Sequence, residues 1–226
     1  MRTLPDGGRL PTEFELAAKH GLSRQTVRRA YQDLVNEGLV QRIPGRGTFA
    51  IPPGHYVRSM GSLEDLLAQS VDTEMEILTP LRRVAMPHER ADERLGVDEV
   101  MEIRIRRLHD QLPFSVVVVS LPADIGIKLG REPMLSRVGE RRHTTVLELL
   151  DRVLDPPIVE AKQVVTVDRA PKAIAALIDV GPRQAILRID RLFIDGAGRP
   201  VELAVNYFNP ERYAYRLELK RVGVPR

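Results

Sequence analysis

The sequence predicts an α+β protein with two domains of different type. Apolar residues recur at helical spacing over residues 13–36, and a short β-hairpin pattern follows at residues 41–50. From about Thr73 onward, short apolar strands alternate with turns, which is typical of an antiparallel sheet with helices packed against it. Two prolines and a glycine at 52–54 separate the two patterns. We therefore expect a first domain at 1–54, a linker at 55–72 and a second domain at 73–226.

The first expected helix has signals at both of its ends. Thr12 follows Pro11 and is suited to cap the N-terminus. Glu15, three residues later, can complete a capping box by accepting a hydrogen bond from the Thr12 backbone. Gly21 ends the helix after about two turns, because glycine adopts the left-handed conformation without steric cost.

A second helix is expected from the capping residue Ser23 to about Asn36, with Gly38 stopping it. One face should pack inward, since its apolar residues recur at helical spacing: Val27, Ala30, Tyr31 and Leu34. Another face carries guanidinium and amide groups suited to bidentate hydrogen bonds with base edges: Arg24, Gln25, Arg28 and Gln32. Such a face on an isolated helix could also be simply solvated, and the segment that follows shifts the balance between the two interpretations.

Residues 41–50 are expected to form a β-hairpin with a cationic tip. Gln41–Ile43 and Thr48–Ala50 would be its strands, joined through Pro44-Gly45-Arg46-Gly47. The glycines on both sides of Arg46 let the backbone approach a phosphate or a narrow minor groove closely. A helix–turn–helix followed by a basic wing is a DNA-binding arrangement, so this context favours DNA contact over a merely solvated face.

The segment LPTEFELAAKHGLSRQTVRRAYQDLVNEGLVQRIPGRGTF resembles the winged helix–turn–helix of GntR-family transcriptional regulators. It meets almost throughout the pattern L-P-[ST]-E…L-A…S-R-x-T-V-R-x-A…L…E-G-L…G-x-G-T-F. Phe14 departs from the pattern, because the family commonly has a phosphate-gripping arginine there. The chain also starts without the helix that usually comes first, which suggests a truncated chain or a misassigned start. The resemblance implies that DNA is contacted by Ser23, Arg24, Gln25, Thr26, Arg28, Gly45, Arg46 and Gly47.

Composition agrees with a basic DNA-binding head. The net charge is +3, and residues 1–54 hold eight basic against five acidic residues, while the remainder holds 26 of each. The excess therefore lies in the segment expected to meet phosphates. The chain has no cysteine, which excludes disulfides and thiolate metal sites and suggests a reducing compartment. Without a long apolar run or a signal-peptide pattern, we expect a soluble, cytoplasmic protein with no membrane partner.

The second domain is expected to alternate strands with a few helices. A short amphipathic stretch at 63–67 lies in the linker before it. The expected helices are 88–95, 144–153 and 172–178. The expected strands are 76–86, interrupted at Pro80, then 100–108, 114–121, 158–167, 185–194, 201–208 and 215–219.

The second domain also contains an internal echo. Arg104-Ile105-Arg106-Arg107-Leu108 and Arg188-Ile189-Asp190-Arg191-Leu192 each follow a helix and precede a turn and a strand. This predicts one supersecondary unit used twice, with a natural ligand cavity between the copies. Strand alternation places Arg107 and Arg191 on faces with core residues. An arginine in such a place needs an anion, either a ligand or an internal partner such as Glu160 or Glu202.

Residues 73–219 resemble the UTRA effector-sensing domain of the HutC-like branch of this family, whose fold resembles that of chorismate lyase. The matching motifs are Ser120-Leu121-Pro122, the segment Asp195–Glu202 (D-G-x-G-R-P-V-E) and Arg212-Tyr213. Sugar-phosphate-sensing members often carry a glutamate in the strand after the turn, whereas Val116–Val119 has no polar residue. We therefore expect a less hydroxylated effector, such as an organic acid. The resemblance implies effector contacts from Arg104, Arg106, Arg107, Glu202 and Tyr207, and leaves open which arginine faces the pocket.

Other chemistry has no sequence support. The five histidines show no H-x-H or H-x₃-H spacing, so no metal site is expected. No P-loop or G-x-S-x-G motif occurs, so we expect neither a cofactor nor catalytic residues.

Together these features predict a DNA-binding transcriptional regulator, a repressor rather than an activator, that is not an enzyme. It would bind a near-palindromic operator as a homodimer, with the UTRA sheet supplying the dimer contact and a small effector controlling operator affinity. Two alternatives differ in class. One is a chorismate-lyase-like enzyme that releases pyruvate, and the other is a ligand-sensing protein without DNA binding.

Overall fold

The computed structural model describes residues 8–36, 39–43, 45–51, 55–59 and 62–217 of the 226-residue chain. The chain divides into two compact units, one formed by 1–59 with 214–226 and the other by 60–213. The domain limits expected from the sequence, 1–54, 55–72 and 73–226, stay a prediction. Within the described residues, no helix combines the length and apolar character that crossing a membrane requires.

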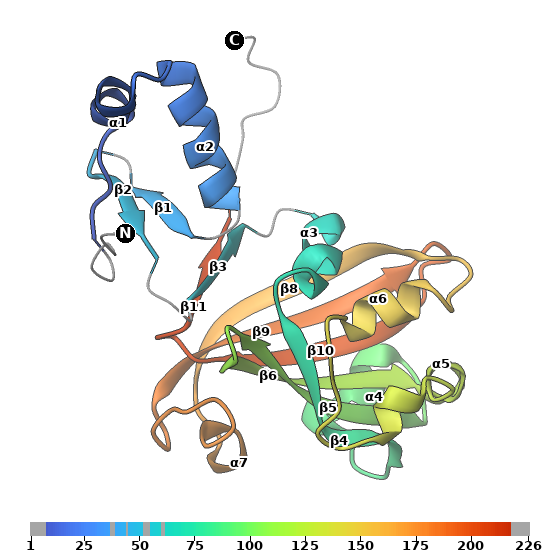
Figure 1. The fold of residues 1–226 in the computed structure, drawn as a ribbon. Helices are drawn as coiled ribbons and strands as arrows, with labels where there is room; N and C mark the ends of the chain where they lie inside the picture. The colour runs from blue at the N-terminus through green and yellow to red at the C-terminus, as the bar shows by residue number, and fades with distance from the viewer. Residues whose placement is uncertain (1–7, 37–38, 44, 52–54, 60–61, 218–226) are drawn as a thin grey trace. The chain divides into compact units, whose positions relative to one another are not determined.

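The first unit begins with two capped helices (Figure 1). Helix α1 (Glu13–His20) has the expected capping box between Thr12 and Glu15, and Gly21 follows it with a left-handed φ of 64°. Helix α2 (Arg24–Asn36) starts after Ser23, whose Oγ accepts a hydrogen bond from the Thr26 backbone N–H at 3.0 Å. The expected stop at Gly38 lies outside the described residues.

A small core holds α1 against α2. Ala17, Val27 and Tyr31 are buried, and the Tyr31 hydroxyl donates a hydrogen bond to the Pro11 carbonyl at 2.5 Å. Ala30 was expected to pack inward and is exposed instead. It lies at the edge of the apolar stripe, on the side away from Tyr31, where the described residues of this unit do not cover it.

The wing forms as expected. Strands β1 (Val40–Ile43) and β2 (Gly47–Ala50) pair antiparallel. Gly45 and Gly47 have φ values of 72° and 116°, so both ends of the Arg46 turn use backbone conformations that favour glycine. A further two-stranded sheet pairs β3 (Tyr56–Ser59) with β11 (Tyr213–Arg216). The sequence did not predict β3.

The second unit is built on one antiparallel sheet (Figure 1). Its order is β7-β4-β5-β6-β10-β9-β8. The bounds are β4 Glu74–Val84, β5 Val100–His109, β6 Leu112–Pro122, β7 Arg141–Arg142, β8 Ile158–Arg169, β9 Ala185–Asp195 and β10 Pro200–Phe208. Strand β4 continues through Pro80, where an interruption was expected, and its register against β5 shifts on both sides of Thr79.

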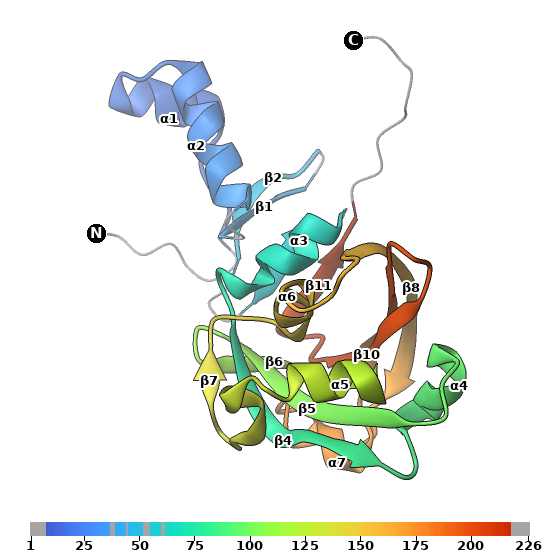
Figure 2. The ribbon, with the colours of Figure 1, turned by 90° about the vertical axis from the view of Figure 1, so that its right-hand side faces the viewer.

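Apolar clusters cover both faces of this sheet. Figures 1 and 2 show the helices that contribute to them. On one face, Val117 and Val119 pack with α3 (Leu63–Leu67), α5 (Ala123–Leu129) and α6 (Val146–Asp151). On the other face, Val116 and Leu203 pack with α4 (Ala91–Leu95) and α7 (Lys172–Ala175). The valine run at 116–119 therefore serves two cores, as expected for a strand that is buried on both sides.

The two R-I-x-R-L segments belong to two copies of one structural repeat. The sequence of elements β4–α4–β5–β6 recurs as β8–α7–β9–β10, and β6 and β10 pair at the centre of the sheet. Each copy of R-I-x-R-L lies in the middle strand of its repeat, in β5 or β9. Equivalent arginines therefore lie on equivalent faces of the two halves.

Three local features differ from the sequence expectation. The expected helix 88–95 is a 3₁₀ turn, η2 (His88–Arg90), followed by α4, because Glu89 and Arg90 have φ values of 53°. Helix α5, the 3₁₀ turn η3 (Pro133–Ser136) and strand β7 were not predicted. Helix α6 is shorter than expected and is capped by Thr145, whose side chain accepts from the Glu148 backbone.

Candidate DNA-binding surface and effector cavity

The exposed face of α2 presents three polar side chains outward. Arg24, Gln25 and Arg28 are all exposed in the first turns of the helix. Among the described residues, none of them has a hydrogen-bond or ion-pair partner. Ser23 and Thr26 instead bond to each other through their hydroxyls at 2.8 Å, which fixes the start of the helix. The geometry therefore separates side chains that hold the helix from side chains that remain available for base edges.

Phe14 of α1 lies beside this face. Its side chain is 64% exposed, which is unusual for an aromatic residue on a short helix. The guanidinium carbon of Arg24 lies 5.7 Å from the centre of the Phe14 ring, a cation–π contact. Phe14 thus supports the Arg24 side chain at the start of α2.

The wing tip is arranged in a similar way. Arg46 is exposed, and its guanidinium lies 5.9 Å from the ring centre of Phe49 on β2. The neighbouring Arg42 makes an ion pair with Glu13 of α1 at 2.5 Å and so ties the wing to the first helix. Among the described cations of the wing, Arg46 is therefore the one that remains available to DNA.

The second unit contains a partly open cavity of about 50 Å³ on one face of the sheet. Its apolar wall includes Ile105, Val117, Val119 and Phe193, and α3 and α6 contribute Leu66 and Leu147. Four polar side chains reach it from the strands, and each is more than nine-tenths buried: Arg107, Arg191, Glu202 and Asn206. An apolar cavity with a few convergent polar groups is the usual form of a small-molecule site.

Arg107 connects the cavity wall to neighbouring elements. Its guanidinium donates to the Gln69 carbonyl at 3.2 Å, to the Thr144 carbonyl at 3.4 Å and to the Thr73 hydroxyl. Gln69 follows α3, and Thr144 precedes α6. The arginine thus donates to two backbone carbonyls and to one hydroxyl of the neighbouring segments.

Glu202 of β10 and Arg191 of the neighbouring strand β9 both line this cavity. Arg191 donates to the Gln163 side chain at 2.7 Å. Burial raises the pKa of Glu202 to about 8, and the nearby Arg191 charge offsets only part of that rise. The Glu202 Oε2 atom is buried and has no hydrogen-bond partner among the described residues. At neutral pH the cavity therefore has two guanidinium groups and a largely protonated carboxyl group.

The expected effector residues divide between the two faces of the sheet. Arg107 and Glu202 line the cavity, whereas Arg104, Arg106 and Tyr207 do not. Arg106 pairs with Glu76 at 2.7 Å on the opposite face. Strand alternation explains the division, since residues separated by an odd number of positions point to opposite faces. Their role in effector binding stays a prediction.

Sequence reasoning did not include Arg191 and Asn206 among the site residues. The second R-I-x-R-L motif already indicated Arg191, because it makes this arginine the counterpart of Arg107. Strand alternation could have indicated Asn206, because it lies four residues after Glu202 on β10 and therefore shares its face. Its side-chain amide donates to the Ile189 and Ala204 carbonyls at 2.9 and 3.1 Å.

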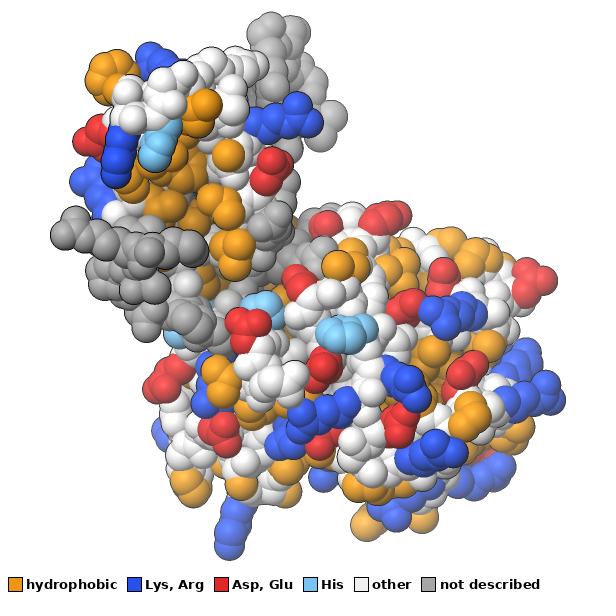
Figure 3. Space-filling view, viewed as in Figure 1, with side chains coloured by type: hydrophobic (Ala, Val, Ile, Leu, Met, Phe, Trp, Pro, Cys, Tyr) orange, Lys and Arg blue, Asp and Glu red, His pale blue; other side chains and the backbone are white. Residues whose placement is uncertain are grey.

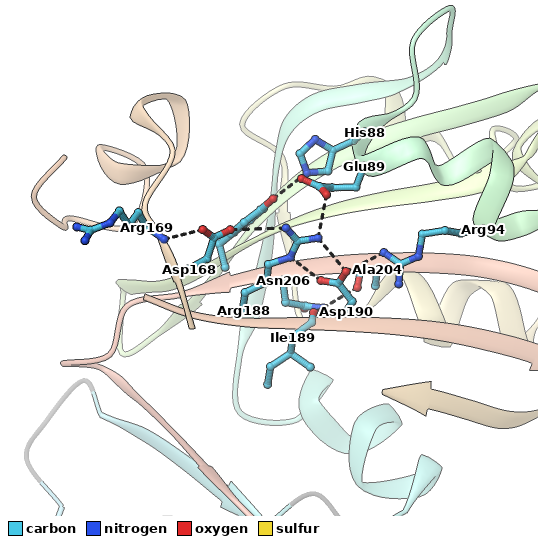
Figure 4. A network of polar contacts seen from close by, with 11 residues as sticks. His88, Glu89, Arg94, Asp168, Arg169, Arg188, Ile189, Asp190, Ala204 and Asn206 are labelled. Carbon is cyan, nitrogen blue, oxygen red and sulfur yellow. Dashed lines mark hydrogen bonds and ion pairs between the residues drawn. The ribbon is translucent and has the colours of Figure 1, made fainter. Parts of the chain in front are cut away.

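Tyr207 instead contacts His88 and Arg188 on the opposite face. Figure 4 shows the polar network to which His88 and Arg188 belong. The Tyr207 hydroxyl lies 2.9 Å from His88 Nε2, and the Arg188 guanidinium lies 5.7 Å from the Tyr207 ring centre. Arg188 pairs with Asp190 at 2.8 Å and with Glu89 at 3.2 Å. Burial raises the pKa of Tyr207 to about 12 and lowers the pKa of His88, so both groups are neutral at pH 7.

A winged helix–turn–helix with an exposed cationic face, joined to a sheet domain with a small apolar cavity that holds a few polar groups, defines an effector-responsive DNA-binding regulator. Residues 2–50 match the bacterial regulatory proteins of the gntR family, and residues 68–214 match the UTRA domain. The chain belongs to the GntR family of DNA-binding transcriptional regulators and carries a UTRA domain, as the sequence predicted.

Relatives agree with this assignment over nearly the whole chain. An HTH-type transcriptional regulator of Mycobacterium tuberculosis, Rv0792c, is 33% identical over 98% of this chain and 81% of its own length. The HTH-type transcriptional repressor NagR of Bacillus subtilis is 26% identical over 91% of this chain and 83% of its own. The crystal structure of PhnF from Mycobacterium smegmatis shares the fold, with a TM-score of 0.61 and 22% identity over 97% of this chain and 94% of its own.

Proposed function

We propose that this regulator is a cytoplasmic repressor that binds a near-palindromic operator as a homodimer and releases it when an organic acid occupies the UTRA cavity. The observation that carries the DNA-binding part is the outward array of Arg24, Gln25 and Arg28. Arg46 at the wing tip would reach the neighbouring minor groove. Ser23, Thr26, Gly45 and Gly47 would support these contacts by fixing the helix start and the wing turn.

Substitution of Arg28 tests the recognition face. A bidentate base contact contributes about 1–3 kcal/mol of discrimination, and a dimer would lose one in each half-site. Arg28→Ala should therefore weaken operator binding at least tenfold while changing binding to unrelated DNA much less, in fluorescence anisotropy at fixed salt. Arg29→Ala, an exposed arginine outside the proposed face, is the matched control. An unchanged sequence preference in Arg28→Ala would show that another surface reads the operator.

The composition of the cavity supports an acidic effector. Two arginines face it, the carboxyl of Glu202 is largely protonated at pH 7, and the wall beside β6 is valine. Bound carboxylate oxygens could accept hydrogen bonds from the guanidinium groups, and the protonated Glu202 could donate one more. The volume of about 50 Å³ also favours a small ligand over a hexosamine phosphate.

Isothermal titration calorimetry with small carboxylates and with a hexosamine phosphate tests the proposed class of effector. Small mono- and dicarboxylates should bind, and Arg191→Met should abolish the heat. Tight binding of a hexosamine phosphate with no binding of carboxylates would contradict the proposed effector class. We further infer that the domain binds its effector without converting it, so incubation with chorismate should release no pyruvate.

Arg107 connects the cavity to the segment 63–70, which follows the DNA-binding unit in the chain. In the described form it holds the Gln69 carbonyl, just after α3. An effector carboxylate would compete for the same guanidinium and weaken this hold on the segment 63–70. Only such a difference in contacts between two states can convert effector binding into a change in operator affinity.

A further inference from the structure

A second cavity, of about 90 Å³, lies where β4 and β5 lose their regular pairing. Its lining includes Thr79, Arg82, Glu102 and Arg104, with Val84 and Val118. The register of β4 against β5 shifts on both sides of Thr79. Such irregularities open a ladder locally and re-aim side chains. This cavity shares no lining residue with the effector cavity.

The charges around this cavity do not balance. Glu102 brings one negative charge, and its Oε1 atom accepts hydrogen bonds from the Ser120 hydroxyl at 3.0 Å and from the His88 backbone N–H at 2.5 Å. Arg82 and Arg104 make no hydrogen bond or ion pair with any described residue. The Nε atom of Arg104 is buried as well, and a buried donor without an acceptor is costly. Two guanidinium groups and one carboxylate thus line the cavity, which leaves an excess of one positive charge.

The second repeat provides an internal comparison. Arg188 occupies in β9 the place that Arg104 occupies in β5, as the first residue of R-I-x-R-L. Arg188 forms ion pairs with Asp190, Glu89 and Asp168 (Figure 4), and its hydrogen bonds to Asp190 and Glu89 raise its pKa above the ordinary arginine value. The counterpart of Asp190 in the first repeat is Arg106, which pairs with Glu76 instead. The same position is therefore neutralised in one repeat and left cationic in the other.

We propose that the Arg82–Arg104 cavity is a second ligand site, which binds a small oxyanion such as a phosphate or carboxylate group. Guanidinium groups match paired oxygens in a bidentate way, and the Thr79 hydroxyl supplies a further donor. One water needs roughly 10–15 Å³ of such space, so this cavity accepts a group the size of phosphate or acetate. The site lies on the face of β5 opposite to Arg107, and its occupant is distinct from the effector.

The test uses the full chain with ¹³C-labelled valine methyl groups, titrated with inorganic phosphate and with acetate against sodium chloride at matched ionic strength. The methyl resonances of Val84 and Val118 should shift saturably with at least one oxyanion and not with chloride. Saturation by phosphate alone indicates a tetrahedral ligand, and saturation by acetate alone indicates a carboxylate. Anion binding in the effector cavity would instead move Val117 and Val119.

Three variants assign the effect to the arginines. Arg104→Met should weaken binding at least tenfold, and the more exposed Arg82→Met about threefold. Arg83→Met, on the same strand but paired with Glu99, is the control and should bind as the wild type does. The proposal is overturned if neither oxyanion shifts Val84 and Val118 saturably, or if Arg82→Met and Arg104→Met bind undiminished. Because Arg82 is exposed, its variant keeps the test decisive even if Arg104→Met fails to fold.

Discussion

At the scale of single residues, the arginines differ in the groups that they contact. Arg106 and Arg188 are held by carboxylates, and Arg107 by backbone carbonyls and a hydroxyl. Arg24 is held by an aromatic ring. The sequence shows only that each of these residues is an arginine. The groups that each one contacts in the structure decide whether it can bind a ligand or DNA.

Phe14 should contribute to operator specificity by restricting Arg24. Phe14→Ala removes the ring that lies 5.7 Å from the guanidinium, so Arg24 would lose more side-chain entropy on binding a base. We expect a three- to tenfold loss of operator affinity with a nearly unchanged salt dependence, measured by anisotropy between 50 and 200 mM salt. Phe14→Arg should instead add a phosphate contact and steepen the salt dependence. An affinity of Phe14→Ala equal to that of the wild type would exclude this role.

Glu202 should make stability depend on pH. Its pKa in the folded chain is about 8, above the ordinary value of 4.5, so folding takes up a proton between these values. Its contribution is fully present below about pH 4.5 and is lost as the pH rises through about 8, a change of about 5 kcal/mol in the free energy of unfolding. Urea denaturation of Glu202→Gln should lack this decline. If Glu202→Gln and the wild type lose stability in parallel between pH 5 and pH 8.5, another group is responsible.

At the scale of elements, those defined by local sequence signals were predicted, and one that depends on close packing was missed. The capped helices α1 and α2 were predicted because their signals lie within a few residues. Helix α5 was missed because it contains Gly126, which lowers helix propensity. A Cβ at Gly126 would come within 2.7 Å of the Met101 side chain, so glycine is needed there for packing on β5. That requirement exists only once the helix lies on the sheet.

The wing turn gives a prediction at this scale. Gly47 has a φ of 116°, and a Cβ there would lie 2.9 Å from the Arg9 side chain, whereas Gly45 has a φ of 72° and open space around it. Gly47→Ala should therefore destabilise the hairpin by more than about 1 kcal/mol, and Gly45→Asn should be tolerated. Operator affinity should fall in the first variant and stay within threefold of the wild type in the second. Equal behaviour of the two variants would contradict the assigned turn geometry.

At the scale of the whole molecule, surface charge and the exposed edge strand of the sheet determine which partners each unit can bind. Figure 3 shows basic and acidic side chains interspersed over the visible face of the larger unit, in agreement with the equal counts in residues 55–226. The excess positive charge belongs to the residues that form the DNA-binding head. The sheet also has a long edge strand, β8, with Val159, Val164 and Val167 exposed. An exposed apolar edge of this length is suited to pairing with a second chain.

The proposed homodimer should depend on this edge. Val164→Lys with Val167→Lys would place two charges on the exposed strand without touching either cavity. We expect the sedimentation coefficient to fall to that of a monomer and operator affinity to fall at least tenfold, since one head would bind one half-site. Ile127→Lys, another exposed apolar position, is the control. A double variant that remains dimeric would place the contact elsewhere.

The sequence by itself determined the two-domain α+β arrangement, the helix caps, the wing and the family, because these depend on residues close together in the chain. Through its repeated R-I-x-R-L it also indicated two related halves. Only the tertiary structure decided which side chains meet. Strand parity and the pairing of β6 with β10 bring Arg107, Arg191, Glu202 and Asn206 into one cavity and send Arg104 and Tyr207 to the opposite face. The reason is that burial and counter-charges come from residues distant in sequence, and a local pattern does not encode them.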